Sequence, residues 1–368
     1  MNNAGWMAKL HREAGEKVFR GALEDLQAGK LRRVEAAHST ALLLSLFVML
    51  SPVALIVAGG VIAVAALPFL GGIFWGGLLI AVGVFLLPAR FRVPERALRR
   101  NDAPRLFKDL DRVSEALGAP KVTVVAVDGS FNAFAAMHRK EVVFGIGAVL
   151  WDASSPEQRL ALVAHETAHF VNGDPSRTRV IGFALQMLDK WEMLLEPDFG
   201  DAAHAFAALL LLPFRWLVAL LNETIRTLLY VQMQRAEYLA DALAAEVAGG
   251  NAVKQLLSTI SLSEYIDEQW STRHGVGSAR GRDVIKMIVE PVVQLNADER
   301  VEIAMSNGKV DHSVDTTHPP THYRIAFLHA ACLTKRKILN NLFDREDMSF
   351  EKEFDAVGES LAAQLEVQ

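Results

Sequence analysis

The feature that most constrains this chain is a continuous run from Ser39 to Ala89 that contains no Asp, Glu, Lys or Arg. A membrane-spanning helix needs about 20 apolar residues, so the run is too long for one crossing and fits two. Pro and Gly residues interrupt it near its middle, where such residues typically mark a turn. We therefore predict a hairpin of two transmembrane helices, over 39–64 and 70–89.

Basic residues on both sides of this run indicate its orientation, because they flank membrane spans on the cytoplasmic side. They are Lys30, Arg32 and Arg33 before the hairpin and Arg90, Arg92, Arg96, Arg99 and Arg100 after it. We expect both ends of the hairpin, and all that follows residue 90, to face the cytoplasm. A cleaved signal peptide fits poorly, since its apolar core is only about 7–15 residues long and lies nearer the start.

Composition excludes several classes of protein. Hydrophobic residues make up 51% and charged residues 22% of the 368 residues, which argues against a disordered chain. The formal net charge of −5 gives no overall basic balance, so we expect no nucleic-acid partner. A single cysteine, Cys332, excludes an internal disulfide framework and a cysteine-based zinc cluster.

After the hairpin the pattern is typical of a folded domain that is mainly α with a small β-sheet. Residues 121–127 and 141–145 predict strands, with a turn at Asp128-Gly129. Residues 154–157, Ser-Ser-Pro-Glu, have the Ser cap, early Pro and early acid that begin a helix. That predicted helix continues into the first motif that carries chemistry.

The motif is HExxH, formed by His165, Glu166 and His169. Four residues advance a helix by about one turn, so both imidazoles point to the same side and can share one metal ion. Glu166 lies beside them and can act as general base on a metal-bound water. The alternative is a pair of solvated histidines on an ordinary helix.

A third ligand is needed, because catalytic zinc sites use three protein ligands and keep a fourth position for water. Glu237 and Asp241 lie four residues apart in a helical context rich in Ala and Leu. Glu237 can bind the metal while Asp241 accepts the free ring N–H of a ligand histidine. An ordinary charged helix face is the alternative for this pair.

The stretch from His165 to Asp174, HETAHFVNGD, resembles the active-site helix of the HtpX-type membrane zinc metalloproteases, which are relatives of the type I CAAX prenyl protease. The pattern E-x-x-A-D beginning at Glu237 resembles the segment with that family's third ligand. His318-Pro followed by Arg324 resembles a late motif of the family. With the N-terminal hairpin, the resemblance runs in order from about residue 38 to residue 330.

The resemblance implies a zincin-like catalytic domain with one zinc ion per chain. The implied ligands are His165, His169 and Glu237. Asp241 and Asp174 are expected to support these ligands from close by. His318 and Arg324 are implied to lie near the metal, where they stabilise developing negative charge or hold acidic side chains; a structural turn is the alternative for His318-Pro319.

Substrate contacts are implied at residues 131–135, which resemble the Asn-Ala segment that holds a substrate backbone in zincins with a Glu ligand. Asn132 and Ala133 would contact the peptide, and the strand at 142–145, with Val143, would pair with it in extended form. A plain turn residue is the alternative for Asn132.

A second polar cluster comprises Asp311, His312, Asp315, His318 and His322. Such a group can bind metal, but its Thr, Pro and Ser neighbours are typical of a loop. We interpret it as a polar loop that lends His318 to the main site.

The function predicted is that of a membrane-bound zinc endopeptidase. The resemblance implies a multi-pass protein of a bacterial inner membrane that cleaves membrane or misfolded polypeptides in quality control. A membrane scaffold or holdase with a silent site, or a CAAX-type prenyl-peptide protease, are the alternatives. An intramembrane protease is disfavoured, since charged residues flank the HExxH motif on both sides. The oligomeric state is left open.

Four domains are expected along the chain. Residues 1–37 predict a charged cytoplasmic helix, solvated or lying on the membrane surface. The hairpin takes 38–90, and the catalytic domain takes 91–335. Extra membrane segments are possible within 180–230, and 336–368 predicts a helical tail with an amphipathic stripe.

Overall fold

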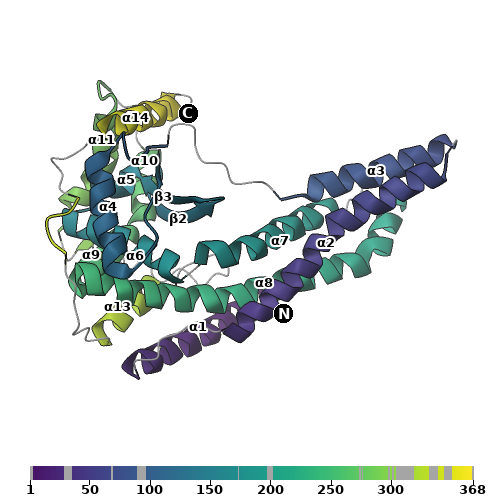
Figure 1. The fold of residues 1–368 in the computed structure, drawn as a ribbon, viewed down its shortest axis with the longest axis horizontal. Helices are drawn as coiled ribbons and strands as arrows, with labels where there is room; N and C mark the ends of the chain where they lie inside the picture. The colour runs from purple at the N-terminus through teal and green to yellow at the C-terminus, as the bar shows by residue number, and fades with distance from the viewer. Residues whose placement is uncertain are drawn as a thin grey trace. The chain divides into compact units, whose positions relative to one another are not determined.

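The structure is a computed structural model, and the ribbon in Figure 1 shows its elements. It describes residues 3–28, 35–67, 69–88, 97–172, 174–196, 202–272, 275, 277–296, 299–300, 302–303, 319–330, 339–343 and 350–366. The chain divides into two compact units. Unit 1 comprises 1–33, 92–175 and 233–368, and unit 2 comprises 34–91 and 176–232. The domain boundaries expected from the sequence stay a prediction.

Unit 1 contains the sheet and most of the short helices. Its elements are α1 (Asn3–Gln27), α4 (Pro104–Leu117), β1 (Val124–Asp128), β2 (Ala133–His138), β3 (Glu141–Gly147), α5 (Ala148–Ala153), α6 (Pro156–Asn172), α9 (Gly250–Ile260), α10 (Ser263–Ser271), α11 (Arg282–Gln294), α13 (Thr321–Ala330) and α14 (Glu351–Glu366). Unit 2 contains α2 (Glu35–Ala65), α3 (Leu70–Leu86) and most of α7 (Asp174–Leu194). The long α8 (Ala202–Ala248) runs from unit 2 into unit 1. The expected fold class, mainly α with a small sheet, is confirmed.

The sheet has three strands in the order β1-β3-β2. β3 pairs with β1 in parallel and with β2 in antiparallel orientation, so it occupies the centre. After its first residue every position of β3 is buried. This burial explains its continuous apolar sequence, because a strand covered on both faces need not alternate. β2 is the strand that the sequence analysis missed.

The core of unit 1 forms because several helices have one apolar face. In α4, Leu106, Leu110 and Val113 recur at helical spacing and are almost fully buried. Pro104 begins that helix, and Gly118 ends it in the left-handed conformation that glycine adopts without strain. Each such buried side chain contributes about 1.5–3 kcal/mol of hydrophobic stabilisation. The predicted amphipathic tail helix, α14, packs on α11 (Figure 1).

The start of α6 follows the predicted signals. The Ser155 hydroxyl accepts a hydrogen bond from the Gln158 N–H at 3.3 Å, and the Gln158 carboxamide accepts one from the Ser155 N–H at 3.0 Å. This reciprocal pair is a capping box, and a good N-cap contributes about 1 kcal/mol. α6 is therefore anchored at its first turn, two to three turns before the HExxH motif.

In unit 2, α2 and α3 pack closely because glycines face each other. A methyl group at Gly59 or Gly76 would lie 2.5 Å from a carbonyl oxygen of the opposite helix, too close for any side chain. Small residues at such contacts are typical of helices that associate in membranes. Large apolar side chains, including Leu43, Phe47 and Phe74, are instead exposed to the surroundings.

By length and composition, two described helical segments could cross a membrane: Ser39–Ala65 in α2 and Phe206–Ala248 in α8. α3 is apolar but has only 17 residues, which is at the short end for a span. The HExxH helix α6 is not among the candidate spans in the described part of the chain.

Candidate metal centre

Two imidazoles of α6 meet one turn apart on the helix. The Nε2 atoms of His165 and His169 lie 3.3 Å from each other. Their rings stand nearly perpendicular, at 87°. One ligand atom from each of His165, Glu166 and His169 falls within 4.8 Å of the others. The five-residue motif therefore gathers two imidazole nitrogens and one carboxylate at a single point.

Glu237 of α8 completes this cluster. Its Oε2 lies 3.3 Å from His165 Nε2, and its Oε1 lies 3.4 Å from His169 Nε2. Charge-assisted hydrogen bonds are shorter, at about 2.7–2.9 Å. Tetrahedral zinc binds N and O ligands at about 2.0–2.1 Å, which places the ligand atoms about 3.3–3.4 Å apart. The three separations are close to this spacing, with one Glu237 oxygen near each imidazole, Oε2 at His165 and Oε1 at His169.

Arg324 and Asp241 contact the side chains of this cluster and hold them in place. The Arg324 guanidinium donates from Nε and Nη2 to the two oxygens of Asp241, at 2.8 and 2.6 Å. Its Nη1 lies 3.3 Å from Glu237 Oε2. Asp241 Oδ1 also lies 3.1 Å from His165 Nδ1. An acceptor on Nδ1 favours the tautomer whose Nε2 lone pair faces the metal position.

The charges of this cluster favour a cation. Glu237 is 3% exposed and Asp241 is fully buried, so two carboxylates are opposed by one guanidinium. Burial alone lowers the pKa of His165, but the charge of Glu237 and the hydrogen bond to Asp241 raise it to about 10. The excess of carboxylate charge that favours a proton on His165 also favours a divalent cation in the proton's place. The donor set of two imidazoles and a carboxylate fits zinc.

Residues 100–331 match Peptidase family M48. The chain belongs to this family. Curated relatives are all described as protease HtpX homologues. That of Pyrobaculum calidifontis is 28% identical over 61% of this chain and 67% of its own length. That of Gemmatimonas aurantiaca is 27% identical over 62% and 76%, and that of Pyrobaculum islandicum is 25% identical over 73% and 81%. No solved structure matches significantly. The HtpX-type resemblance is thereby confirmed, and it supports a peptidase.

The prediction that Val143 contacts the substrate of this M48 peptidase is wrong. It is fully buried in β3, whose two edges are already paired with β1 and β2, so the strand at 142–145 has no free edge. In the described chain the outer edge of β2 is not paired with another strand. Asn132 and Ala133 lie at the start of that strand, and the Asn132 side-chain oxygen accepts the Ala133 N–H at 2.8 Å.

Other expected residues of the M48 site lie outside what the structure describes. His318 and the Asp174 side chain are among them, as are Asp311, His312 and Asp315. His322 is described and lies exposed on α13, with its ring 4.3 Å from that of Tyr323. Arg324, by contrast, reaches the metal centre from the same helix.

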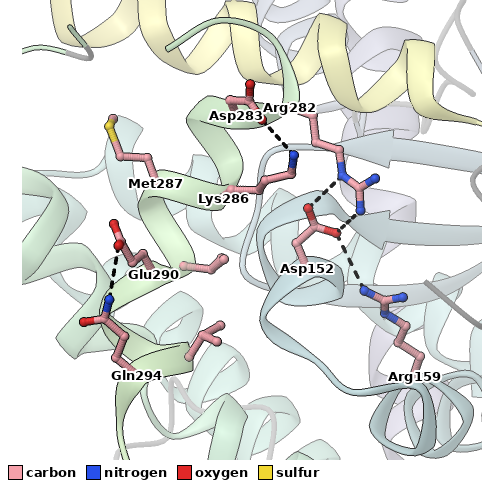
Figure 2. A pocket seen from close by; sticks show the side chains of 10 residues that line it. Asp152, Arg159, Arg282, Asp283, Lys286, Met287, Glu290 and Gln294 are labelled. Atoms are coloured by element: carbon pink, nitrogen blue, oxygen red, sulfur yellow. Dashed lines mark hydrogen bonds and ion pairs between the residues drawn. The ribbon is translucent and has the colours of Figure 1, made fainter. Parts of the chain in front are cut away.

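A separate cavity of about 590 Å³ lies between α11 and the segment from α5 to the start of α6 (Figure 2). Asp152 is its polar centre. Arg282 binds both Asp152 oxygens at 2.9 and 2.8 Å, and Arg159 approaches one of them at 3.7 Å. Arg159 also donates to the Trp151 carbonyl at 2.9 Å. The sequence did not predict this cluster, because the residues around an arginine do not show which distant carboxylate it pairs with.

Proposed function

We propose that this chain is a membrane-bound zinc endopeptidase with one zinc ion per chain, held by His165, His169 and Glu237. The observation that carries the proposal is the convergence of His165 Nε2, His169 Nε2 and the Glu237 carboxylate, with separations of 3.3, 3.3 and 3.4 Å, close to the spacing of ligand atoms around zinc. Membership of Peptidase family M48 supports the peptidase activity.

Different residues of the chain have different roles in the proposed hydrolysis. Zinc, when bound, lowers the pKa of a water and polarises the scissile carbonyl. Glu166 takes the proton of the attacking water and delivers it to the leaving amine nitrogen. Asp241 fixes the ring of His165, and Arg324 holds both Asp241 and Glu237 in place. His318 is proposed to donate to the developing negative charge.

An extended peptide is the substrate form that the sheet supports. The outer edge of β2 can add a strand through main-chain hydrogen bonds, which bind a backbone without regard to side-chain identity. Asn132 and Ala133 would contact the peptide where this edge begins. Such binding suits an endopeptidase that cleaves unfolded or misfolded chains.

The membrane location rests on α2, α3 and the apolar part of α8. We propose a multi-pass protein of the inner membrane whose catalytic unit faces the cytoplasm, as the flanking basic residues indicate. Membrane and misfolded proteins are its proposed substrates, and quality control is its proposed role. The relatives named HtpX proteases support this choice over a scaffold or a CAAX-type protease.

The test is digestion of casein by the detergent-purified chain, with chelator, zinc add-back and a Glu166→Gln control. We expect cleavage that the chelator abolishes and zinc restores, and none from Glu166→Gln. A zinc-loaded wild-type protein that cleaves nothing would favour the scaffold. Cleavage of a prenylated CAAX peptide but not of casein would favour the CAAX-type alternative.

A further inference from the structure

The N-terminal helix α1 is part of unit 1 although it lies outside residues 100–331, which match the peptidase family. Ala22 is fully buried and Val18 nearly so, so one face of α1 is covered by protein. The sequence predicted a helix that is solvated or lies on the membrane surface, and the structure instead covers this face of it with protein. α1 is also the element that immediately precedes α2 in the chain.

Phe19 of α1 contacts aromatic residues from two different helices of the metal centre. Its ring centroid lies 6.0 Å from that of Tyr238 in α8 and 5.2 Å from that of Tyr323 in α13. Tyr238 directly follows Glu237, and Tyr323 directly precedes Arg324. Phe19 therefore touches the neighbours of a proposed metal ligand and of the arginine that holds it.

A second contact joins α1 to the same part of α8. Asp25 forms an ion pair with Arg235, whose side chain is only 14% exposed. Arg235 lies two residues before Glu237. Two contacts of different chemistry, one aromatic and one ionic, therefore connect α1 to the turn of α8 that contains the third ligand.

We propose that α1 is a positioning element that sets the spacing of α8 and α13, with Phe19 as its central residue. The separations between Arg324 and its two carboxylates, 2.6 to 3.3 Å, depend on that spacing. A misplacement of about 1 Å at an active site can cost 10²-fold in rate. The inference rests on the proposed function for the roles of Glu237 and Arg324, but α1 acts on them from outside residues 100–331, which match the peptidase family.

The test compares Phe19→Ala, Phe19→Leu and Arg20→Ala in the full-length detergent-purified chain. Arg20 is the matched control, because it is the next residue of α1 and its side chain is 71% exposed. For each variant, kcat and KM on casein are measured, and zinc affinity is measured by competition with a chromophoric chelator. Thermal unfolding shows whether each variant is folded.

For Phe19→Ala we expect kcat to fall between about 10- and 100-fold with KM nearly unchanged, and zinc to bind about tenfold more weakly. Phe19→Leu keeps most of the apolar volume and should restore most of both values. Arg20→Ala should match the wild type. If Phe19→Ala does not fold, Asp25→Asn should show smaller losses in the same direction.

The proposal is overturned if Phe19→Ala and Asp25→Asn both keep wild-type kcat and zinc affinity, or if Arg20→Ala loses as much as Phe19→Ala. Zinc affinity separates this inference from the proposed function. A wild type that binds zinc but cleaves nothing would end the peptidase proposal, while weaker zinc binding in Phe19→Ala would still support the positioning role.

Discussion

Two buried clusters of unit 1 use the same residue types but differ in their balance of charge. Around Asp152, two arginines converge on one carboxylate, Arg159 also donates to the Trp151 carbonyl, and the carboxylates of Glu351 and Asp355 add negative charge near Arg282. At the metal centre, one arginine faces two carboxylates while two imidazole nitrogens point at the same place. An excess of converging acceptors distinguishes a cation site from a structural ion-pair cluster.

The largest effect that we expect comes from Glu166→Gln. Removing the proposed general base should lower kcat by about 10³-fold or more, at the upper end of general acid–base contributions. Zinc content should stay at the wild-type level, because Glu166 is not a proposed ligand. Casein cleavage measures the loss of kcat, and metal analysis of the same sample measures the zinc content. A variant that keeps most of its activity would refute the role of Glu166 as general base.

The substitution Glu237→Gln tests whether the excess of acceptors at the metal centre binds the cation. The substitution keeps the shape of the side chain but removes one negative charge from the cluster, so zinc should bind at least about 100-fold more weakly. Casein cleavage at low zinc should be lost with it. Zinc affinity equal to that of the wild type would mean that Glu237 is not a ligand.

A smaller effect is expected from Arg324→Lys. Lysine keeps the charge but cannot bind both Asp241 oxygens and Glu237 with one planar fork. We expect zinc affinity to fall about 10-fold, which is at the low end of losses from residues that support metal ligands. Equilibrium competition with a chelator measures the change, with Arg20→Ala as the unaffected reference.

The smallest effect on activity is expected at the other cluster. Asp152→Asn removes the carboxylate that pairs with both Arg159 and Arg282, so stability should fall by about 3 kcal/mol. At temperatures where the variant is folded, its kcat and zinc content should equal those of the wild type. A loss of zinc in Asp152→Asn would contradict the division between a structural cluster and a metal centre.

Local features of the fold were predictable from the sequence because they depend on neighbours in the chain. The cap at Ser155 and the meeting of His165 with His169 follow from helix geometry alone. β2 was missed because its sequence, AFAAMH, has little β-propensity, so its pairing with β3 decides its structure. The error at Val143 has the same origin, since strand order is a long-range property.

Contacts between segments that are distant in the sequence could not be predicted from residue spacing alone. The approach of Glu237 to the histidines joins residues far apart in sequence: the need for a third ligand made Glu237 a candidate, and the family resemblance favoured it over an ordinary charged helix face. The buried face of α1 carried too weak a signal, because Val18 and Ala22 are small and stand among charged residues. Contacts between distant segments depend on packing that no local pattern encodes.

The measurement that tests the central claim most directly is the metal content of the purified wild type beside a His165→Ala, His169→Ala double variant. Three donors that converge on one point should hold about one zinc ion per wild-type chain, and the double variant should hold almost none. A double variant that keeps its full zinc content, for instance through the polar cluster at 311–322, would contradict the account.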